Sequence, residues 1–597
     1  MRRDPHSYAD DEQPRVVRLV WRARVDFPSR TIEADARLIL SDMIMLSGPL
    51  DLDTRDLTIL EVSDGEGRAL AFSLGPPDPI RGARLRVELL PGTRAVAIRY
   101  RTSPQASALH WLPAEATLSR RFPFVYSQCQ AIHARSLVPL PDTPTGRITL
   151  DIELTVPSEV RGLAAAIFVG REERGALAVE KFVLERAVPP YLLAIAVGDL
   201  AARDVGPRSR VWADPALLER AAWELAPVEE LLAAAERLYG PYPWERFDLL
   251  LLPSAFPYGG MENPTLAFFS PSLLAGDRSL FTLVAHELAH AWTGSLVTAA
   301  TAEHFWINEG FTVYAERRLI EERDGREAAA LAAALGRRAL DDAHASLVAR
   351  PELARLRSSL DGIHPDEAAS AIPYEKGYLL LRALEEAVGR ARLDALLRAF
   401  VNRFTDRSIT TDEVAAFLDE RLPEAMARVD LRRWLAEAGL PAGAPRSPSV
   451  RLDELRALAV RGGTPDRLTP LEWQVFLDAL PRPLGVARAA ALDERFTLTR
   501  STNHEVLVAW LPTAIAADYA PAVARAVDLV GETGRMKHLK PLYLALAARP
   551  QSRAEVGPLY RSHRERYHPI ARHVLETILR TQGIAVAVAN PVGLRRR

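Results

Sequence analysis

Two histidines four residues apart, with a glutamate beside the first, are the residues in this chain best suited to bind a metal ion. They stand in "HELAH" as His286, Glu287 and His290. On a helix, residues four apart share one face, so both imidazoles can bind the same ion. Glu287 is one step round from His286, within reach of a water that the metal activates. This is the H-E-x-x-H pattern, in which the glutamate is the general base.

A catalytic zinc ion also needs a third protein ligand and an open fourth position. Glu309 follows His290 by 19 residues in "WINEGFTVYAERR", which lets one helix end and a second return. Glu316 falls on the same face of that second helix and could orient a ligand histidine, although an ordinary ion-paired helix glutamate is an equal alternative. Two imidazoles and a carboxylate suit zinc, while cobalt and manganese accept the same donors. We expect one Zn2+ per chain; the alternative is two amphipathic helices rich in His and Glu.

A glycine pair upstream of this window is the next candidate. In "FPYGGMENP", Gly259 and Gly260 allow a close backbone approach, and Met261 and Glu262 follow on an expected edge strand or loop beside the zinc. A carboxylate there could hold a substrate ammonium group. A glycine turn followed by a glutamate is also common in ordinary loops.

The elements before residue 205 are expected to be strands. In "RITLDIELTVP" apolar residues alternate with polar ones, which is the pattern of a half-buried strand. "ARLRVELLPGTRAVAIRYR" repeats it on both sides of a Pro91-Gly92 turn. Many such segments predict an N-terminal antiparallel β domain, a saddle or sandwich, over residues 1–205.

The pattern becomes helical after this domain. Asp214 is the expected N-cap of a long helix, with Pro215 at its first position and Gly240 at its end. We assign 206–440 to a catalytic domain, 441–450 to a Pro-rich linker and 451–597 to an α-helical domain built as a stack of helix pairs.

The composition excludes several classes of protein. A net charge of -2 over 597 residues gives no reason to expect a nucleic acid or an anionic membrane as partner. A single cysteine, Cys129, excludes an internal disulfide framework and suits a reducing compartment. No apolar stretch resembles a secretory signal or a membrane span. We therefore expect a cytoplasmic protein, and we take it to be a monomer.

Eight segments in the same order resemble the leukotriene A4 hydrolase and zinc aminopeptidase family and extend over essentially the whole chain. They are "SQCQAIHARSLVPLPDTP", "FPYGGMENP", "LLAGDRSL", "HELAHAWTGSLVT", "HFWINEGFTVYAER", "IPYEKGYLLL", "SITTDE" and "GRMKHLKPL". The resemblance implies a multidomain α+β fold. Its parts are the β saddle, a thermolysin-like, mostly α catalytic domain and a C-terminal helical domain of armadillo or HEAT type.

The resemblance also implies roles for single residues. Glu262 would bind the free α-ammonium of a peptide, helped by Gln128 from "SQCQ", so that the first peptide bond meets the zinc. Tyr374 in "PYEKG" would donate a hydrogen bond to the developing oxyanion. Arg535 and Lys537 in "GRMK" would bind the carboxylate of a short peptide. Residues two apart do not share a helix face, so this pair is expected in a loop or at a helix start after Gly534.

Asp366 resembles the aspartate that directs a second water in the epoxide hydrolase reaction of bifunctional family members. Its surroundings differ, because Ala369 and Ala302 stand where those enzymes carry aromatic residues. Asp366 could instead cap a helix or line the peptide cleft.

Three functions follow from these residues. The leading one is a zinc aminopeptidase, a hydrolase that removes N-terminal residues from di- and tripeptides with a free N-terminus. The second is an epoxide hydrolase of leukotriene-like fatty-acid epoxides that uses the same zinc. The third, from another class, is a non-catalytic peptide-binding protein.

Overall fold

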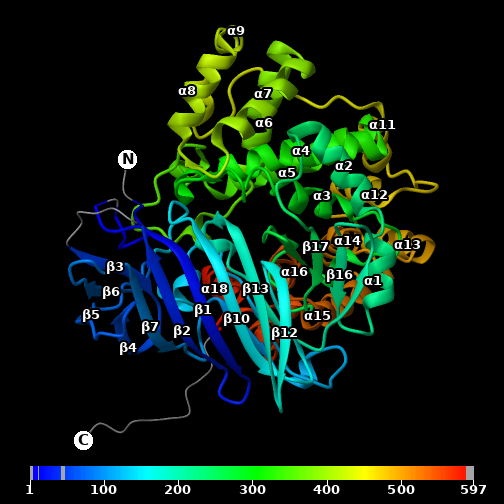
Figure 1. The fold of residues 1–597 in the computed structure, drawn as a ribbon. Helices are drawn as coiled ribbons and strands as arrows, with labels where there is room; N and C mark the ends of the chain where they lie inside the picture. Colours follow the sequence, from blue (N-terminus) through cyan, green and yellow to red (C-terminus); the bar gives the residue numbers. More distant parts are fainter. Residues whose placement is uncertain (1–3, 11, 42–47, 587–597) are drawn as a thin grey trace, which may run out of the picture. The chain divides into compact units, whose positions relative to one another are not determined.

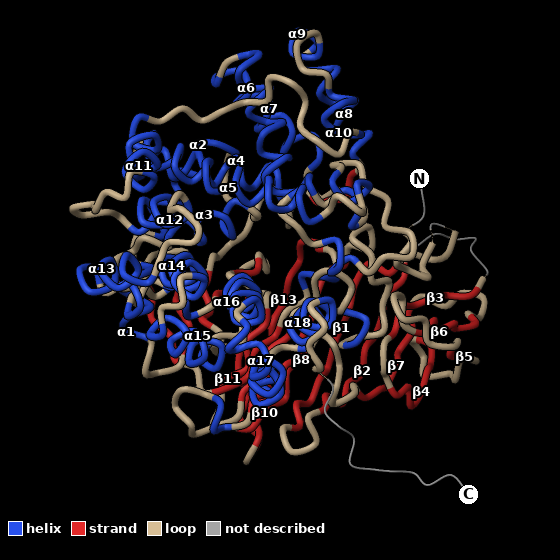
Figure 2. The backbone as a smooth tube through the Cα atoms, turned by 180° about the vertical axis from the view of Figure 1, so that it is seen from behind, coloured by secondary structure: helices blue, strands red, loops and turns tan. Residues whose placement is uncertain are grey.

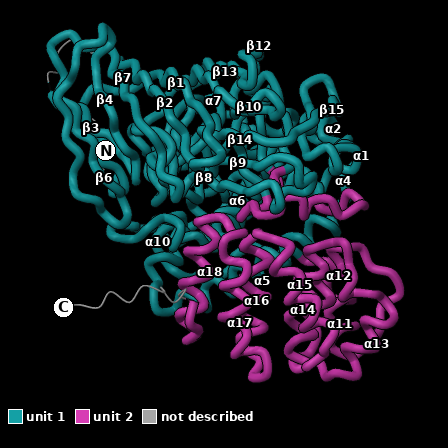
Figure 3. The backbone as a smooth tube through the Cα atoms, turned by 90° about the horizontal axis from the view of Figure 1, so that it is seen from below, with its two compact units in different colours: residues 1–251, 260–268, 281–447 teal, residues 252–259, 269–280, 448–597 magenta. Residues whose placement is uncertain are grey.

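The computed structural model describes residues 4–10, 12–41 and 48–586. Figure 1 shows their helices and strands, and Figure 3 colours the two compact units to which they belong. The first comprises residues 1–251, 260–268 and 281–447, and the second 252–259, 269–280 and 448–597. The change from one unit to the other at residue 448 falls within the stretch 441–450 that the sequence suggests as a linker.

The N-terminal part of the first unit is built from three β-sheets. The largest has the strand order β12-β13-β10-β1-β2-β7-β4, namely Ile167–Arg174, Leu177–Val188, Ile148–Pro157, Val16–Asp26, Thr31–Leu40, Ala95–Arg101 and Thr58–Asp64. The second is β3-β6-β5, namely Pro49–Thr54, Ala83–Glu88 and Phe72–Leu74. The third is β11-β14-β9-β8, namely Arg161–Ala164, Ile195–Gly198, Phe124–Ser127 and Leu109–Leu112.

The alternating pattern is confirmed along β10, where every second residue is buried. Two details differ from the expectation. β1 and β10 pair in parallel, because these strands are far apart in the chain and are joined by a long crossover rather than a hairpin. The strands on either side of Pro91-Gly92, β6 and β7, belong to different sheets.

A five-stranded sheet follows in the order β15-β16-β17-β19-β18, namely Ala201–Asp204, Arg210–Ala213, Asp248–Leu251, Leu266–Phe269 and Gly260–Met261. The glycine-rich segment thus contributes the edge strand β18, as predicted. Two short strands, β20 (Thr298–Ala299) and β21 (Ser408–Ile409), pair in parallel beyond it.

The helices of the first unit are α1 to α10, namely Leu218–Leu225, Val228–Tyr239, Phe281–Ala289, Trp306–Asp324, Arg326–Ser346, Gly377–Val388, Arg390–Phe404, Thr411–Arg421, Pro423–Met426 and Leu431–Ala436. The single long helix expected after Asp214 is wrong. Pro227 has no backbone N–H, and the chain divides there into α1 and α2. Gly240 ends α2 as predicted.

The second unit contains helices joined by loops, seen in blue and tan in Figure 2. They are α11 to α18, namely Val450–Val460, Pro470–Asp478, Val486–Phe496, His504–Ala516, Ala520–Glu532, Met536–Ala548, Pro550–His563 and Pro569–Thr581. α14 packs against α12, α15 and α16, and its Trp510 is fully buried in their shared core. This arrangement confirms the predicted C-terminal helical domain.

Candidate metal centre and active site

Helices α3 and α4 bring the three predicted metal ligands together. His286 lies in the last turn of α3, His290 directly follows that helix, and Glu309 lies in the first turn of α4. The two Nε2 atoms are 3.1 Å apart, and each is 3.4 Å from Oε2 of Glu309. Tetrahedral zinc with bonds of about 2.0–2.2 Å places its ligand atoms about 3.4 Å apart. The donor set therefore fits a zinc ion without rearrangement.

The carboxylate of Glu309 gives independent evidence for a cation at this point. Among the described residues, its buried Oε2 has no hydrogen-bond partner. Burial alone would raise the pKa of Glu309, but the adjacent imidazoles outweigh burial and lower its pKa to about 2. A buried, ionised oxygen that faces two imidazole nitrogens has the character of a metal ligand.

Both histidines are held from the opposite side of the ring. Nδ1 of His286 is 2.9 Å from Oε2 of Glu316, which lies two turns beyond Glu309 on α4. Nδ1 of His290 is 2.9 Å from the backbone oxygen of Thr293. Because Nδ1 donates to these oxygens, each Nε2 keeps its lone pair for the metal. Glu316 thus occupies the position suited to orienting His286.

Glu287 points to the same space without being one of the three ligands. It is buried, and burial raises the pKa of its carboxyl to about 7 although His286 and His290 oppose the change. A Cβ built on Gly260 would lie only 2.4 Å from Oε1 of Glu287. The edge strand β18 can therefore run against this carboxylate only because residue 260 has no side chain.

Glu262 follows that strand and lies next to the same centre. Oxygens of Glu262 and Glu287 and a ring nitrogen of His290 all lie within 4.8 Å of one another. Nε2 of Gln130 donates to Oε1 of Glu262 at 3.0 Å. Gln128 from the same motif donates to the sulfur of Met261 at 3.2 Å, and its help in binding the substrate ammonium stays a prediction. Gln130 was not predicted as a site residue, although it stands in the same "SQCQ" motif.

Tyr374 lies beside the ligands, in a π-helical turn η8 (Ile372–Lys376). Its ring stacks on His286 with centroids 6.1 Å apart. The turn approaches α4 at two glycines, since a Cβ on Gly310 would lie 2.7 Å from the Cα of Gly377. The next residue, Glu375, forms a buried bidentate ion pair with Arg317 at 2.8 and 3.0 Å. Neither the glycine contact nor this ion pair was foreseen, and together they hold Tyr374 against His286.

Arg535 and Lys537 lie in the second unit at the start of α16, as predicted from their spacing. They converge on one carboxylate, that of Glu505, at 2.8 and 2.7 Å. Arg535 also donates to Oγ of Ser272 at 3.3 Å and to Nε2 of His538 at 3.2 Å. Glu505 was not predicted, because it comes from a different helix, α14.

Asp366 lies in a short 3-10 helix, η7 (Pro365–Ala368). It is not the cap of this helix, because the N-cap is His364, whose Nδ1 accepts from the N–H of Asp366. The carboxylate of Asp366 lies 2.9 Å from Nε2 of His133. The structure therefore places Asp366 in a pair with a histidine that the sequence analysis did not single out.

The fold and the site define a zinc-dependent peptidase. The sequence matches the Peptidase family M1 domain over residues 223–434 and the leukotriene A4 hydrolase C-terminal domain over residues 468–579. The chain belongs to the M1 peptidase family, whose members of this kind are zinc aminopeptidases. It is therefore a hydrolase, and the reading as a non-catalytic protein is set aside.

Relatives match along nearly the whole chain. Leukotriene A-4 hydrolase of Xenopus laevis is 34% identical over 594 residues, 95% of this chain and 97% of that protein. Leucine aminopeptidase 2 of Emericella nidulans is 34% identical over 555 residues, 88% of this chain and 89% of that protein. The structure of yeast LTA4 hydrolase in complex with bestatin superimposes with a TM-score of 0.90 at 29% identity, covering 97% of each chain.

No helix among the described residues is long and apolar enough to cross a membrane.

Proposed function

We propose that this chain is an aminopeptidase that removes N-terminal residues from di- and tripeptides and other short peptides. The supporting observation is the closeness of Glu262 to Glu287 and His290, within 4.8 Å. Successive Cα atoms are about 3.8 Å apart. A peptide whose ammonium group binds Glu262 therefore has only its first peptide bond beside Glu287.

The chain's own residues then divide the work. Glu262, supported by Gln130, binds and orients the substrate ammonium. Glu287 takes a proton from the attacking water and passes it to the leaving amine. The hydroxyl of Tyr374 donates a hydrogen bond to the developing oxyanion. When bound by His286, His290 and Glu309, zinc supplies a Lewis acid for the carbonyl and lowers the pKa of water.

The remaining assignments belong to the same proposal. Arg535 and Lys537 bind the C-terminal carboxylate of the peptide; their shared contact with the carboxylate of Glu505 holds the two cations close together. Gly259 and Met261 flank Gly260 and line the substrate. One catalytic zinc is bound per chain, and the protein acts as a cytoplasmic monomer.

The test compares a free tripeptide with its N-acetylated form in the wild type and in two variants. Glu287→Gln should abolish turnover of the free peptide and retain zinc, because Glu287 is not a ligand. Glu262→Gln should raise KM for the free peptide. It should also reduce the ratio of kcat/KM for the free peptide to kcat/KM for the N-acetylated one. Equal cleavage of both peptides by the wild type would refute an exopeptidase.

Epoxide hydrolysis is the second candidate. It is favoured by the similarity to the Xenopus laevis leukotriene A-4 hydrolase and by the presence of Asp366. Ala369 and Ala302 stand where the epoxide-hydrolysing members carry aromatic residues, which argues against epoxide hydrolysis. An allylic fatty-acid epoxide incubated with wild type and Asp366→Asn decides the matter, since enzymatic diol formation must depend on Asp366.

A further inference from the structure

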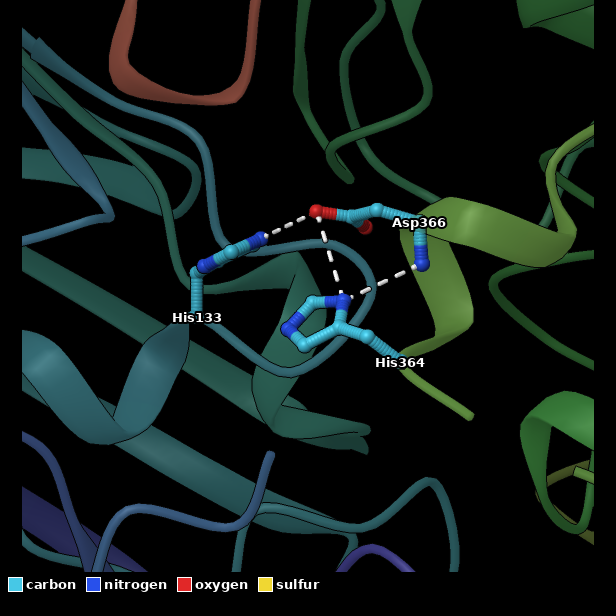
Figure 4. A group of neighbouring side chains, drawn as sticks. All are labelled: His133, His364 and Asp366. Atoms are coloured by element: carbon cyan, nitrogen blue, oxygen red, sulfur yellow. Dashed lines mark hydrogen bonds and ion pairs between the residues drawn. The ribbon is translucent and has the colours of Figure 1, made fainter. Parts of the chain in front are cut away.

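Three side chains outside the predicted zinc site, one buried and two half-buried, converge from distant parts of the chain (Figure 4). His133 immediately precedes the short helix η2 (Ala134–Ser136), whereas His364 and Asp366 belong to the start of η7. Their side chains are only 5%, 12% and 9% exposed. One potential ligand atom from each lies within 4.8 Å of the other two.

Hydroxyl groups hold the His133 ring at Nδ1. Nδ1 lies 2.9 Å from Oγ of Ser107, which donates to Oγ of Ser136 at 3.3 Å. Ser136 donates to the backbone oxygen of His133 at 2.8 Å. With the ring held in this way, Nε2 faces Oδ2 of Asp366 at 2.9 Å.

His364 approaches the same carboxylate. Its Nδ1 accepts from the backbone N–H of Asp366 at 3.2 Å, so Nδ1 is unprotonated. The same Nδ1 lies 3.7 Å from Oδ2 of Asp366. Two imidazole nitrogens and a carboxylate oxygen, donor atoms that suit a transition metal, therefore lie around one point.

We propose that His133, His364 and Asp366 form a second metal site for a divalent transition ion such as Zn2+ or Co2+. The donor types are those of the catalytic centre, two imidazoles and one carboxylate. Oδ2 of Asp366 lies 2.9 Å from Nε2 of His133 and 3.7 Å from Nδ1 of His364, which brackets the roughly 3.4 Å between ligands of tetrahedral zinc. Binding exchanges the 3.2 Å backbone hydrogen bond to His364 for a metal bond.

The second site binds metal more weakly than the catalytic one. Asp366 is the only carboxylate of its donor set, and the positively charged Arg55 lies close enough to interact with it. The catalytic centre instead has Glu309 as ligand, with Glu262 and Glu287 nearby. Because the second site is surrounded by less negative charge, it needs a higher free metal concentration to be filled.

The experiment counts bound metal rather than activity. Metal-stripped full-length protein is titrated with Zn2+ by calorimetry, and the bound zinc is counted by mass spectrometry. The wild type should take up one tight and one weaker equivalent. His364→Asn retains an oxygen that can cap η7 but removes the imidazole. It should keep the tight equivalent and weaken the second at least as much as the roughly 10- to 100-fold produced by losing an outer partner. His573→Asn, at an exposed histidine on α18, is the matched control and should bind as the wild type does.

The absorption spectrum of Co2+ distinguishes binding at one defined site from nonspecific binding at the surface. The second Co2+ should add ligand-field absorption in the wild type and in His573→Asn, but not in His364→Asn. A single equivalent in the wild type overturns the proposal, as does a His364→Asn variant that binds two equivalents normally. If the NMR signals of the His133 ring do not respond to added zinc, the proposal is wrong.

Discussion

Gly260→Ala should inactivate the enzyme without unfolding it or removing its zinc. The new Cβ would lie 2.4 Å from Oε1 and 2.5 Å from Cγ and Cδ of Glu287. Ordinary contact begins near 3.4 Å, so the carboxylate must move by roughly 1 Å. The displaced atoms belong to one flexible side chain, so the fold can absorb the change, but the base leaves its position.

A misplacement of about 1 Å can cost roughly 100-fold in rate. We therefore expect kcat for a tripeptide to fall about 100-fold, equivalent to roughly 3 kcal/mol of activation free energy. Zinc content should stay at the wild-type value, because Glu287 is not a ligand. The measurements are steady-state kinetics, zinc analysis and a melting curve on the same preparation.

Gly439→Ala is the matched control, since a Cβ there meets nothing within 4 Å and its backbone is not in the left-handed region. Its kcat should equal that of the wild type. A Gly260→Ala enzyme within twofold of the wild type would refute the reasoning about Glu287. Loss of zinc together with activity would show that the strand disturbs the ligands instead.

Two further predictions concern the supports of the site and of the second unit. Glu316→Gln replaces the acceptor at 2.9 Å from His286 and should weaken zinc binding about 10- to 100-fold in chelator competition; unchanged affinity would exclude the orienting role. Burial lowers the pKa of His538 to about 4, and its Nε2 accepts from Arg535, so unfolding adds a proton below about pH 6.5. The free energy of unfolding is therefore unaffected by His538 above pH 6.5. It falls by up to about 3 kcal/mol as the pH is lowered from 6.5 towards 4, because only the unfolded state binds the proton in this range. His538→Gln should therefore show a smaller drop in Tm between pH 7.5 and 5 than the wild type, and an identical drop would contradict this assignment.

The sequence was most informative where a spacing alone determines the geometry. His286 and His290 are one helical turn apart, so the placement of both on one metal followed from the period of the helix. The same period placed Glu316 on the same face of α4 as Glu309, near the ligand histidines. Alternation along β10 predicted its buried face for the same reason.

The sequence was less informative where two distant segments meet. Gln128 and Gln130 both stand in "SQCQ", and only the fold shows that Gln130 reaches Glu262. The pairing of Asp366 with His133 joins residues 233 positions apart. Glu505 approaches Arg535 from a different helix. No local periodicity reports such contacts, because each depends on how the chain returns to the same place.

The zinc ligands themselves do not determine which peptide bond is cut. Two imidazoles, a carboxylate and a neighbouring glutamate can serve an endopeptidase or an exopeptidase equally well. In the proposed function, cleavage is limited to the first bond by a second carboxylate, that of Glu262, which lies within 4.8 Å of Glu287. That proximity requires the edge strand β18 to run directly against Glu287, which only a glycine at 260 permits. On this proposal, specificity for the N-terminus depends on the close approach of β18 to α3 as much as on the charged residues.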